Sequence, residues 1–314
     1  MKKNLIEIKN LTKTFSSSKN WLKKEKIETK AVNDVSFEIK KGEILALVGE
    51  SGSGKSTTAR CLLMLEKPTS GDIFFDGIEI TNPKCNIQHL RKKMQMVFQN
   101  PYGSLNPKMK VKDILKEPLK INKKMSSKEM DAIITETCHL TGIDTDYLDR
   151  YPHEFSGGQR QRIGIARAII LKPDFIIADE PVSALDVSIQ AQILNLLKDL
   201  KEKLNLTYLF ISHDLSVVQH IADRVAVMYL GEIVEIATKQ ELFDNPVHPY
   251  TKLLINSTPK IGCSNNFQEK ITENNTTNGC SFAPRCVDCK ELCKTEKANY
   301  KHLSPTHIVK CHFS

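Results

Sequence analysis

The sequence lacks any long hydrophobic run: none of its apolar stretches approaches the ~20 residues that a membrane-spanning helix needs. The first residues, Met1 to Leu5, also lack the apolar core of a signal peptide. We therefore expect a soluble cytoplasmic protein, in which any role at a membrane depends on partner subunits.

The sequence also lacks a large excess of either sign of charge, because 45 Lys and Arg against 37 Asp and Glu leave a net charge of only +8. The lysines are scattered, apart from a group between Lys19 and Lys30. A nucleic-acid-binding face needs clustered positive charge, so we expect no nucleic-acid partner. The length of 314 residues allows one large domain and a smaller one, with an ample core.

Alternating and apolar segments predict strands that are interleaved with helices, which is typical of an α/β fold with a largely parallel sheet. A capping box at Ser126 and Glu129 begins one helix, and Gly142 ends it. A second, amphipathic helix covers 189–204. We expect strands at 5–9, 35–39, 43–48, 94–98, 174–179 and 207–212, hairpins at 72–80 and 225–236, and a linker at 264–279.

A glycine-rich segment follows the apolar run Ile44–Val48, which is short enough to be a buried strand, and precedes a segment that can continue as a helix. Its spacing, a glycine, four residues and then Gly-Lys-Ser, is that of the phosphate-binding P-loop in its strand–loop–helix setting. Backbone N–H groups and a helix N-terminus together hold polyphosphate. The segment comprises Gly49, Glu50, Ser51, Gly52, Ser53, Gly54, Lys55, Ser56 and Thr57.

Two side chains of this loop have predicted roles. Lys55 is expected to neutralise the β- and γ-phosphates of a nucleoside triphosphate, and Ser56 to ligate Mg²⁺. The alternative, a flexible Gly/Ser-rich loop without a ligand, is disfavoured by the strand before it and the helix after it. The sequence therefore predicts a nucleoside triphosphate and Mg²⁺ as ligands.

Two acidic residues, Asp179 and Glu180, stand at the end of the apolar strand that begins at Phe175. A carboxylate beside a P-loop can hold Mg²⁺ through water, which assigns that role to Asp179. Glu180 is then free to orient or deprotonate the attacking water. The alternative is a solvated acidic pair at the end of a strand.

A further glycine pair lies in the segment Ser156, Gly157, Gly158 and Gln159, which precedes a helix over 160–171. Adjacent glycines before a helix make an anion-binding N-terminus, although Ser-Gly-Gly alone is common in loops. The specific signal is the order: a P-loop, about 100 residues, Ser-Gly-Gly-Gln, about 15 residues, and a strand ending in Asp-Glu.

With these motifs in order, residues 5–237 resemble the ATP-binding-cassette (ABC) ATPases. Ser156 to Gln159 match the signature motif of that family, with Phe155 in place of the usual preceding leucine. The resemblance makes Gln99 a ligand of Mg²⁺ and, like His213, a sensor of the γ-phosphate. The ring of Phe15 takes the place that stacks on adenine, and Ser183 to Asp186 match the D-loop.

The resemblance implies an α/β P-loop NTPase core with an antiparallel β subdomain and an inserted helical subdomain at about 100–165. We expect the nucleotide-binding domain to span 1–237 and a C-terminal extension to span 238–314. The family also implies a head-to-tail dimer with a homologous ATPase subunit, in which each ATP touches the P-loop of one chain and the signature of the other.

Several stretches resemble the ATPases of bacterial oligopeptide and dipeptide importers. They are the Q-loop region 98–107, the segment 151–155 before the signature, and residues 245–251 and 279–286 of the extension. We expect the insertion Ser16–Lys30 to be a long, mobile hairpin loop rather than a docking surface. Its length also favours the subunit labelled F. The implied partners are two transmembrane permease subunits and an extracytoplasmic solute-binding protein, at the cytoplasmic face of the membrane.

Three other functions stay open on the sequence alone. Nickel and glutathione importers share the same features, so the transported substrate is not determined. A soluble nucleic-acid or ribosome ATPase would use the same cassette, but without a membrane partner. A regulatory subunit that barely hydrolyses ATP is the third, and the complete motif set argues against it.

Nine cysteines are distributed unevenly, and four of them, Cys280, Cys286, Cys293 and Cys311, are spaced by five, six and seventeen residues. Disulfides are rare in a reducing cytosol, and zinc prefers paired C-x2-C knuckles, of which Cys286 and Cys289 offer one. A [4Fe–4S] cluster needs four thiolates and tolerates irregular loops. The resemblance to peptide-importer ATPases in which such a cluster occurs favours iron–sulfur, as a structural staple, with Cys289 as an alternate ligand or spare.

Overall fold

The computed structural model describes residues 3–18, 26–122, 125–257 and 279–314. Contacts divide the chain into two compact units, each of which is described by itself. The first unit comprises 1–3, 40–43 and 84–211, and the second comprises 4–39, 44–83 and 212–314. No helix in these described segments is both long and apolar enough to cross a bilayer.

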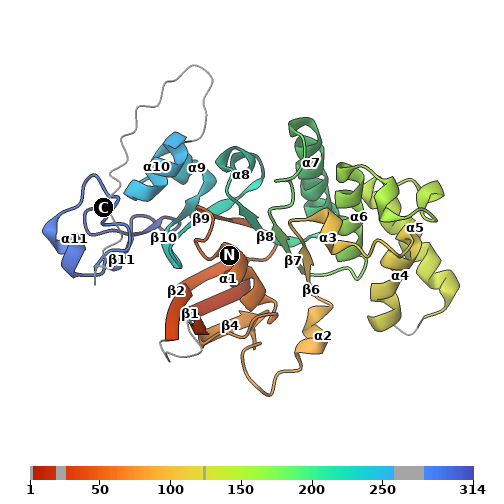
Figure 1. Ribbon diagram of the computed structural model, residues 1–314, viewed down its shortest axis with the longest axis horizontal. Coiled ribbons are helices and arrows are strands. Elements are labelled where there is room, and N and C mark those ends of the chain that lie inside the picture. The colour runs from red at the N-terminus through yellow and green to blue at the C-terminus, as the bar shows by residue number, and fades with distance from the viewer. Residues whose placement is uncertain (1–2, 19–25, 123–124, 258–278) are drawn as a thin grey trace. The chain divides into compact units, whose positions relative to one another are not determined.

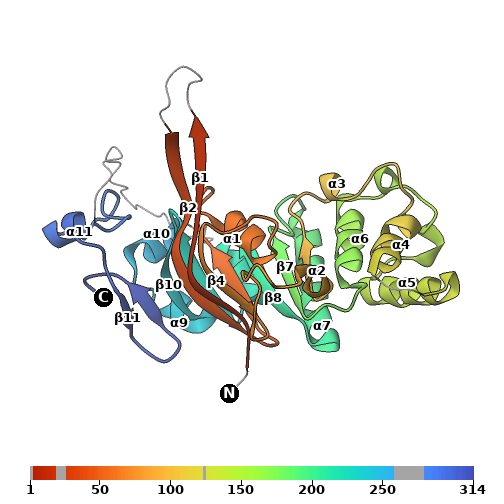
Figure 2. The ribbon, with the colours of Figure 1, turned by 90° about the horizontal axis from the view of Figure 1, so that it is seen from below.

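The second unit contains an antiparallel sheet in the order β2-β1-β4-β5. Its strands are β1 (Asn4–Ser18), β2 (Lys26–Lys40), β4 (Ser70–Phe75) and β5 (Ile78–Glu79). Figure 2 shows β1 and β2 side by side. Both strands extend into the segment expected to be a loop, so that expectation is wrong for 16–18 and 26–30, whereas 19–25 lie outside the described residues.

The same unit contains the strands β3 (Ile44–Val48), β9 (Arg224–Tyr229), β10 (Glu232–Thr238), β12 (Ile308–Lys310) and β11 (Tyr300–His302). β3 pairs with β9 in parallel, and β10, β12 and β11 follow as antiparallel neighbours. Every residue of β3 is buried, as its continuous apolar run predicts. The helices of this unit are α1 (Lys55–Leu62), α8 (Leu215–Ile221), α9 (Lys239–Asp244), α10 (Pro249–Ser257) and α11 (Glu291–Thr295).

The first unit contains three parallel strands, β6 (Met94–Val97), β7 (Phe175–Asp179) and β8 (Thr207–Ser212). Two helices flank them in the sequence, α2 (Ile87–Arg91) and α7 (Val187–Leu204). β7 and β8 are buried along their whole length. Because the carboxyl ends of parallel strands share one edge of a sheet, Asp179 and the residues that follow β6 lie at the same edge.

The inserted helices of this unit are α3 (Pro101–Ser104), α4 (Val111–Asn122), α5 (Ser127–Thr141) and α6 (Gly157–Ile169), with 3₁₀ turns at Thr145–Tyr147 and Pro152–Glu154. Figure 1 shows α4, α5 and α6 packed together. Buried apolar residues of all three helices join them, among them Leu115, Ile134 and Ile163. The capping box at Ser126 begins α5, and Gly142 ends it in a left-handed conformation, as predicted.

The predicted α/β class, with an antiparallel sheet and a helical insertion, is therefore confirmed. The linker expected at 264–279 lies almost wholly outside the described residues. The short strands β11 and β12 are not predicted from the sequence, because each has only three residues and no alternating pattern.

Candidate nucleotide-binding site

The P-loop connects β3 to α1 and passes close to two other backbone segments. Gly49 has a φ of +151°, and a Cβ there would lie 2.1 Å from the carbonyl oxygen of Met228. Gly54 has a φ of +105°, and a Cβ there would lie 2.2 Å from the carbonyl oxygen of Ala31. Only glycine fits such contacts, so these positions are explained by the packing of the loop as well as by its curvature.

The loop encloses the ammonium group of Lys55, whose side chain is nearly buried. Its Nζ donates to the carbonyl oxygens of Gly49 and Glu50, both at 2.7 Å, and lies 3.3 Å from Oγ of Ser53. Ser56 follows in the first turn of α1, where no acidic residue opposes an anion. A cation beside a helix N-terminus of this kind suits polyphosphate.

Two residues beyond the cassette also contact the P-loop, and sequence reasoning missed both. The N–H of Glu50 donates to the hydroxyl of Tyr250 at 2.9 Å, and the carboxylate of Glu50 pairs with the guanidinium of Arg285 at 2.8 Å. They lie 200 and 235 residues away in the sequence, and no local pattern reports contacts at that separation.

The acidic pair occupies the end of β7. Asp179 is its last residue and is 6% exposed. Glu180 has a φ of +44°, which is uncommon outside glycine, and its N–H donates to the carbonyl oxygen of Ile211 at 3.0 Å. Nε2 of Gln99 donates to Oε2 of Glu180 at 2.8 Å. The structure thus brings together two of the residues that the sequence singled out.

The signature segment forms the start of α6. The Oγ of Ser156 accepts the N–H of Gln159 at 3.3 Å, and Oε1 of Gln159 accepts the N–H of Ser156 at 2.9 Å, which is a capping box. A Cβ at Gly158 would lie 2.5 Å from Cγ2 of Ile189 in α7. Ser156 and Gln159 are exposed, whereas Phe155 is buried in the helical core.

The remaining predicted residues lie on the surface. Asp186 precedes α7 and is exposed, and His213 follows β8 and is also exposed. Phe15 is 42% exposed, with Nζ of Lys13 at 4.8 Å from the centre of its ring. The P-loop, Phe15 and His213 belong to the second unit, whereas Gln99, Asp179, Glu180, the signature and Asp186 belong to the first.

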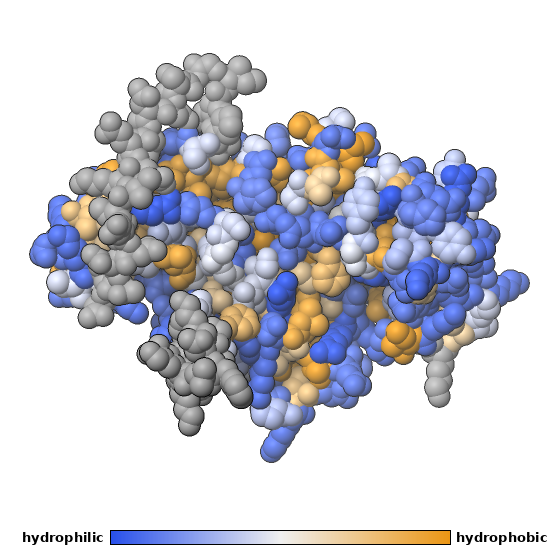
Figure 3. Space-filling view, in the orientation of Figure 1, coloured by the Kyte–Doolittle hydropathy of each residue, from blue (hydrophilic) through white to orange (hydrophobic). Residues whose placement is uncertain are grey.

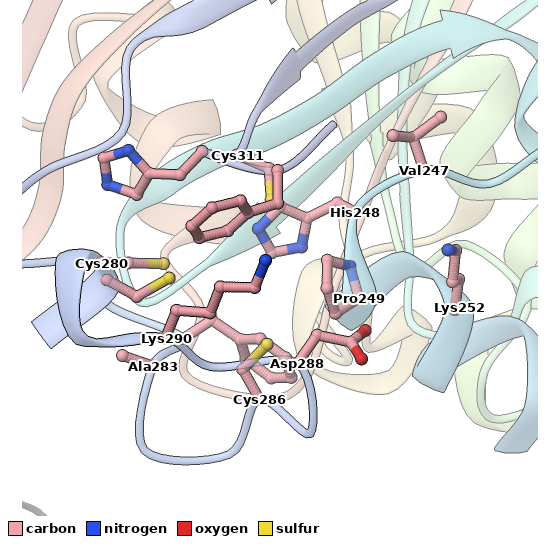
Figure 4. Close-up of a pocket in the computed structure, with 14 residues that line it drawn as sticks. Val247, His248, Pro249, Lys252, Cys280, Ala283, Cys286, Asp288, Lys290 and Cys311 are labelled. Atoms are coloured by element: carbon pink, nitrogen blue, oxygen red, sulfur yellow. The ribbon is translucent and has the colours of Figure 1, made fainter.

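The four cysteines singled out by their spacing line a single cavity of about 280 Å³ (Figure 4). Cys280 and Cys286 reach it from one turn and Cys311 from another segment, and Cys293 also lines it, whereas Cys289 does not. The cysteines in the described segments are reduced, and burial raises the pKa of Cys286 to about 11. Within the described residues, no group of three or more His, Cys, Asp or Glu is arranged to hold a metal ion.

Two family models match the chain. One, described as ABC transporter, matches residues 32–183, and the other, described as oligopeptide/dipeptide transporter, C-terminal region, matches residues 234–293. Among solved structures, a dimeric post-hydrolysis state of the ATP-binding cassette MJ0796 bound to ADP and Pi is similar, with 30% identity and a TM-score of 0.66. That likeness covers 74% of this chain and 98% of the cassette.

The curated relatives agree with both models. The oligopeptide transport ATP-binding protein AppF of Bacillus subtilis (strain 168) is 47% identical over 98% of this chain and 97% of its own. The oligopeptide transport ATP-binding protein OppF of the same organism is 51% identical, over 99% and 97%. The dipeptide transport ATP-binding protein DppF of Haemophilus influenzae is 48% identical, over 90% and 89%. All three carry the label F, as the resemblance predicts, and the chain belongs to the ABC transporter ATP-binding proteins of the oligopeptide and dipeptide group.

Proposed function

We propose that this chain is the ATPase subunit of a bacterial ABC importer, which couples ATP binding and hydrolysis to the uptake of oligopeptides or dipeptides. The observation that carries the proposal is the agreement along nearly the whole chain with transport ATP-binding proteins that are named for these substrates. The match of residues 234–293 adds to it, because that segment lies beyond the cassette itself.

The phosphate-binding part of the reaction falls to the second unit. The enclosed ammonium of Lys55 neutralises the β- and γ-phosphates when it turns from the loop carbonyls to the ligand. Ser56, at the start of α1, would hold Mg²⁺, as would Gln99 and Asp179, and the ion would neutralise charge on the phosphates. His213 senses the γ-phosphate, and the ring of Phe15 stacks on adenine.

The hydrolytic part falls to the first unit. Glu180 is the base that orients or deprotonates the attacking water, and it follows the buried strand in a left-handed backbone conformation. The hydrogen bond from Gln99 holds the carboxylate of Glu180 in one rotamer. Gln99 would hold Mg²⁺ through its amide oxygen and sense the γ-phosphate through its amide N–H, in place of the bond to Glu180.

This chain forms a head-to-tail dimer with a second ATPase subunit. The backbone N–H groups and the exposed hydroxyl of Ser156, with Gly157 and Gly158, serve the nucleotide of the partner. On the face shown in Figure 3, hydrophobic residues gather over α7, whose first residue, Val187, is 83% exposed and directly follows Asp186. Exposed apolar residues of this kind suit a protein interface. The further partners are two permease subunits and a solute-binding protein, at the cytoplasmic face of the membrane.

The test is the substitution Glu180→Gln, with Glu136→Gln as the control. Glu136 is a carboxylate that pairs on the surface of α5 with Lys172, far in sequence from any motif. The Glu180 variant should bind ATP, lose at least about a hundredfold in turnover and accumulate as a closed dimer with its partner subunit in size-exclusion chromatography. Near-normal turnover would remove Glu180 from the role of base, and reduced turnover in the control would show that the assay reports general damage.

We also infer that Cys280, Cys286, Cys293 and Cys311 hold an iron–sulfur cluster. Support comes from the four cysteines, which line one cavity of about 280 Å³ and whose number matches the four thiolates that a [4Fe–4S] cluster needs. When bound, such a cluster would act as a structural staple, since four thiolate bonds would join segments of the extension that share few backbone hydrogen bonds.

Iron analysis of the full chain, purified without oxygen, tests this assignment. About four iron atoms per chain and a brown colour are expected. Cys286→Ser should lose most of the iron, whereas Cys85→Ser, outside the extension, should retain it. Folded wild-type protein that is colourless and free of metal would contradict the assignment.

A further inference from the structure

Two side chains of the C-terminal extension contact Glu50 of the P-loop. Arg285 forms a two-point ion pair with its carboxylate, with Nη1 at 2.8 Å from Oε2 and Nη2 at 2.9 Å from Oε1. Tyr250 accepts the backbone N–H of the same residue at 2.9 Å. The carbonyl oxygen of Glu50, in turn, accepts from Lys55. The side chain, the N–H and the carbonyl oxygen of Glu50 therefore each make a hydrogen bond.

Tyr250 and Arg285 both lie against the aromatic rings of Tyr229 and Phe282. Tyr250 is completely buried, with its ring centre 4.6 Å from that of Tyr229 in β9 and 5.4 Å from that of Phe282. Arg285 belongs to a tight turn, in which its N–H donates to the carbonyl oxygen of Phe282 at 3.0 Å. Its guanidinium lies within 6 Å of both the Tyr229 and the Phe282 rings, at 5.7 Å and 5.8 Å. A planar guanidinium in such a setting fixes the orientation of a carboxylate, which an ammonium cannot do.

We propose that Arg285 and Tyr250 are positioning residues of the nucleotide site, and that they hold the P-loop through Glu50 in the curvature that admits the phosphates. Neither residue needs to touch the nucleotide. They order the loop before the nucleotide binds, so that nucleotide binding does not carry the entropic cost of ordering the loop. This assigns the extension a direct part in nucleotide affinity, and it rests on nucleotide binding by this chain.

The size of the effect follows from the exposure of the pair. The side chains of Arg285 and Glu50 are 24% and 42% exposed, so solvent screens their attraction, and loss of the pair should weaken nucleotide affinity by about three- to fivefold. The hydrogen bond from the N–H of Glu50 to Tyr250 is partly buried and neutral, and its loss should have an effect of similar size.

The test is binding of Mg-ADP to the full chain by isothermal titration calorimetry, since ADP is not hydrolysed. Arg285→Ala and Tyr250→Phe should each raise the Kd about three- to fivefold, and Arg285→Lys should lie between Arg285→Ala and wild type. Lys294→Ala is the matched control, because it removes an exposed ion pair with Glu291 in the same extension. In ATPase assays with the partner subunit, KM should rise while kcat stays within about twofold.

A double-mutant cycle separates positioning from general damage. The variant Glu50→Gln combined with Arg285→Ala should bind ADP no more weakly than the poorer of the two single variants, because both remove one interaction. Independent, multiplicative losses would overturn the proposal, as would wild-type Kd values in both Arg285→Ala and Tyr250→Phe. Tyr250→Phe keeps the buried ring, so it remains decisive if Arg285→Ala does not fold. Failure of the wild-type chain to bind ADP would instead refute the proposed function.

Discussion

The carboxylate of Glu235 gives the sharpest test of how the extension is attached. Glu235 lies in β10 and is completely buried, and it accepts the N–H groups of Val247 and His248, both at 2.9 Å. Its other close contact is Nε2 of His307 at 2.7 Å, and that ring is 5% exposed. One side chain therefore binds both the segment before α10 and the segment before β12.

The cost of Glu235→Ala can be worked from these three contacts. Each of the three buried donors that lose this acceptor costs about 1–3 kcal/mol, which gives about 3–9 kcal/mol together. Because water can enter the space that the side chain leaves, we expect the lower part of that range, about 3–5 kcal/mol. For a chain of this size that corresponds to a fall in Tm of roughly 10 °C.

Thermal unfolding and hydrogen exchange together check this prediction. The amides of Val247 and His248 should lose protection in Glu235→Ala more than those of the P-loop strand do. Glu136→Ala is the control, because it removes an exposed ion pair and should shift Tm by less than about 1 °C. A Tm within about 2 °C of wild type, with both amides still protected, would refute the reasoning.

Three further outcomes are expected. Gly54→Ala places a Cβ 2.2 Å from the carbonyl oxygen of Ala31 at a φ of +105°, so Mg-ADP affinity measured by calorimetry should fall at least about tenfold. Gly164→Ala should raise Tm, since its Cβ in α6 meets nothing within 4 Å and helix propensity improves by about 0.5–1 kcal/mol. Hydrogen bonding, first from the hydroxyl of Thr238, lowers the pKa of Glu241 from 4.5 to about 2. A lowered folded-state pKa means stability that is present above pH 4.5 and lost toward pH 2, so the difference in Tm between wild type and Glu241→Gln should shrink as the pH falls from 5 to 3.

Elements with a strong local signal are the ones that sequence reasoning predicts well. The buried strand Ile44–Val48 and the capping box at Ser126 are defined by residues that are neighbours in the sequence, and the structure has both. The lengths of β1 and β2 are underestimated, because a polar, lysine-rich composition suits a loop and an exposed hairpin equally well. The strands β11 and β12 are too short for a periodic signal, and their pairing with β10 is a long-range contact.

The residues and contacts of the candidate site also differ in how far the sequence predicts them. Motif spacing singles out Lys55 and Glu180 as candidates, because the chemistry of phosphate transfer requires fixed residue types at fixed offsets. The contact between Gln99 and Glu180 follows from two strands that end at one edge of a parallel sheet, so it is partly predictable. The contact of Arg285 with Glu50 is not, because it depends on how the extension folds back.

These long-range contacts show that the extension packs as part of the same unit as the P-loop. The sequence divides the chain after 237, yet Glu235 and Ile236 pair with Val309 and Ile308 across that boundary. The cavity lined by the four cysteines and the turn that carries Arg285 share Cys280, Phe282 and Cys286, so the cavity adjoins the turn whose guanidinium pairs with Glu50. The segment that follows the cassette in the sequence thus contacts the start of the P-loop in the fold, at Glu50.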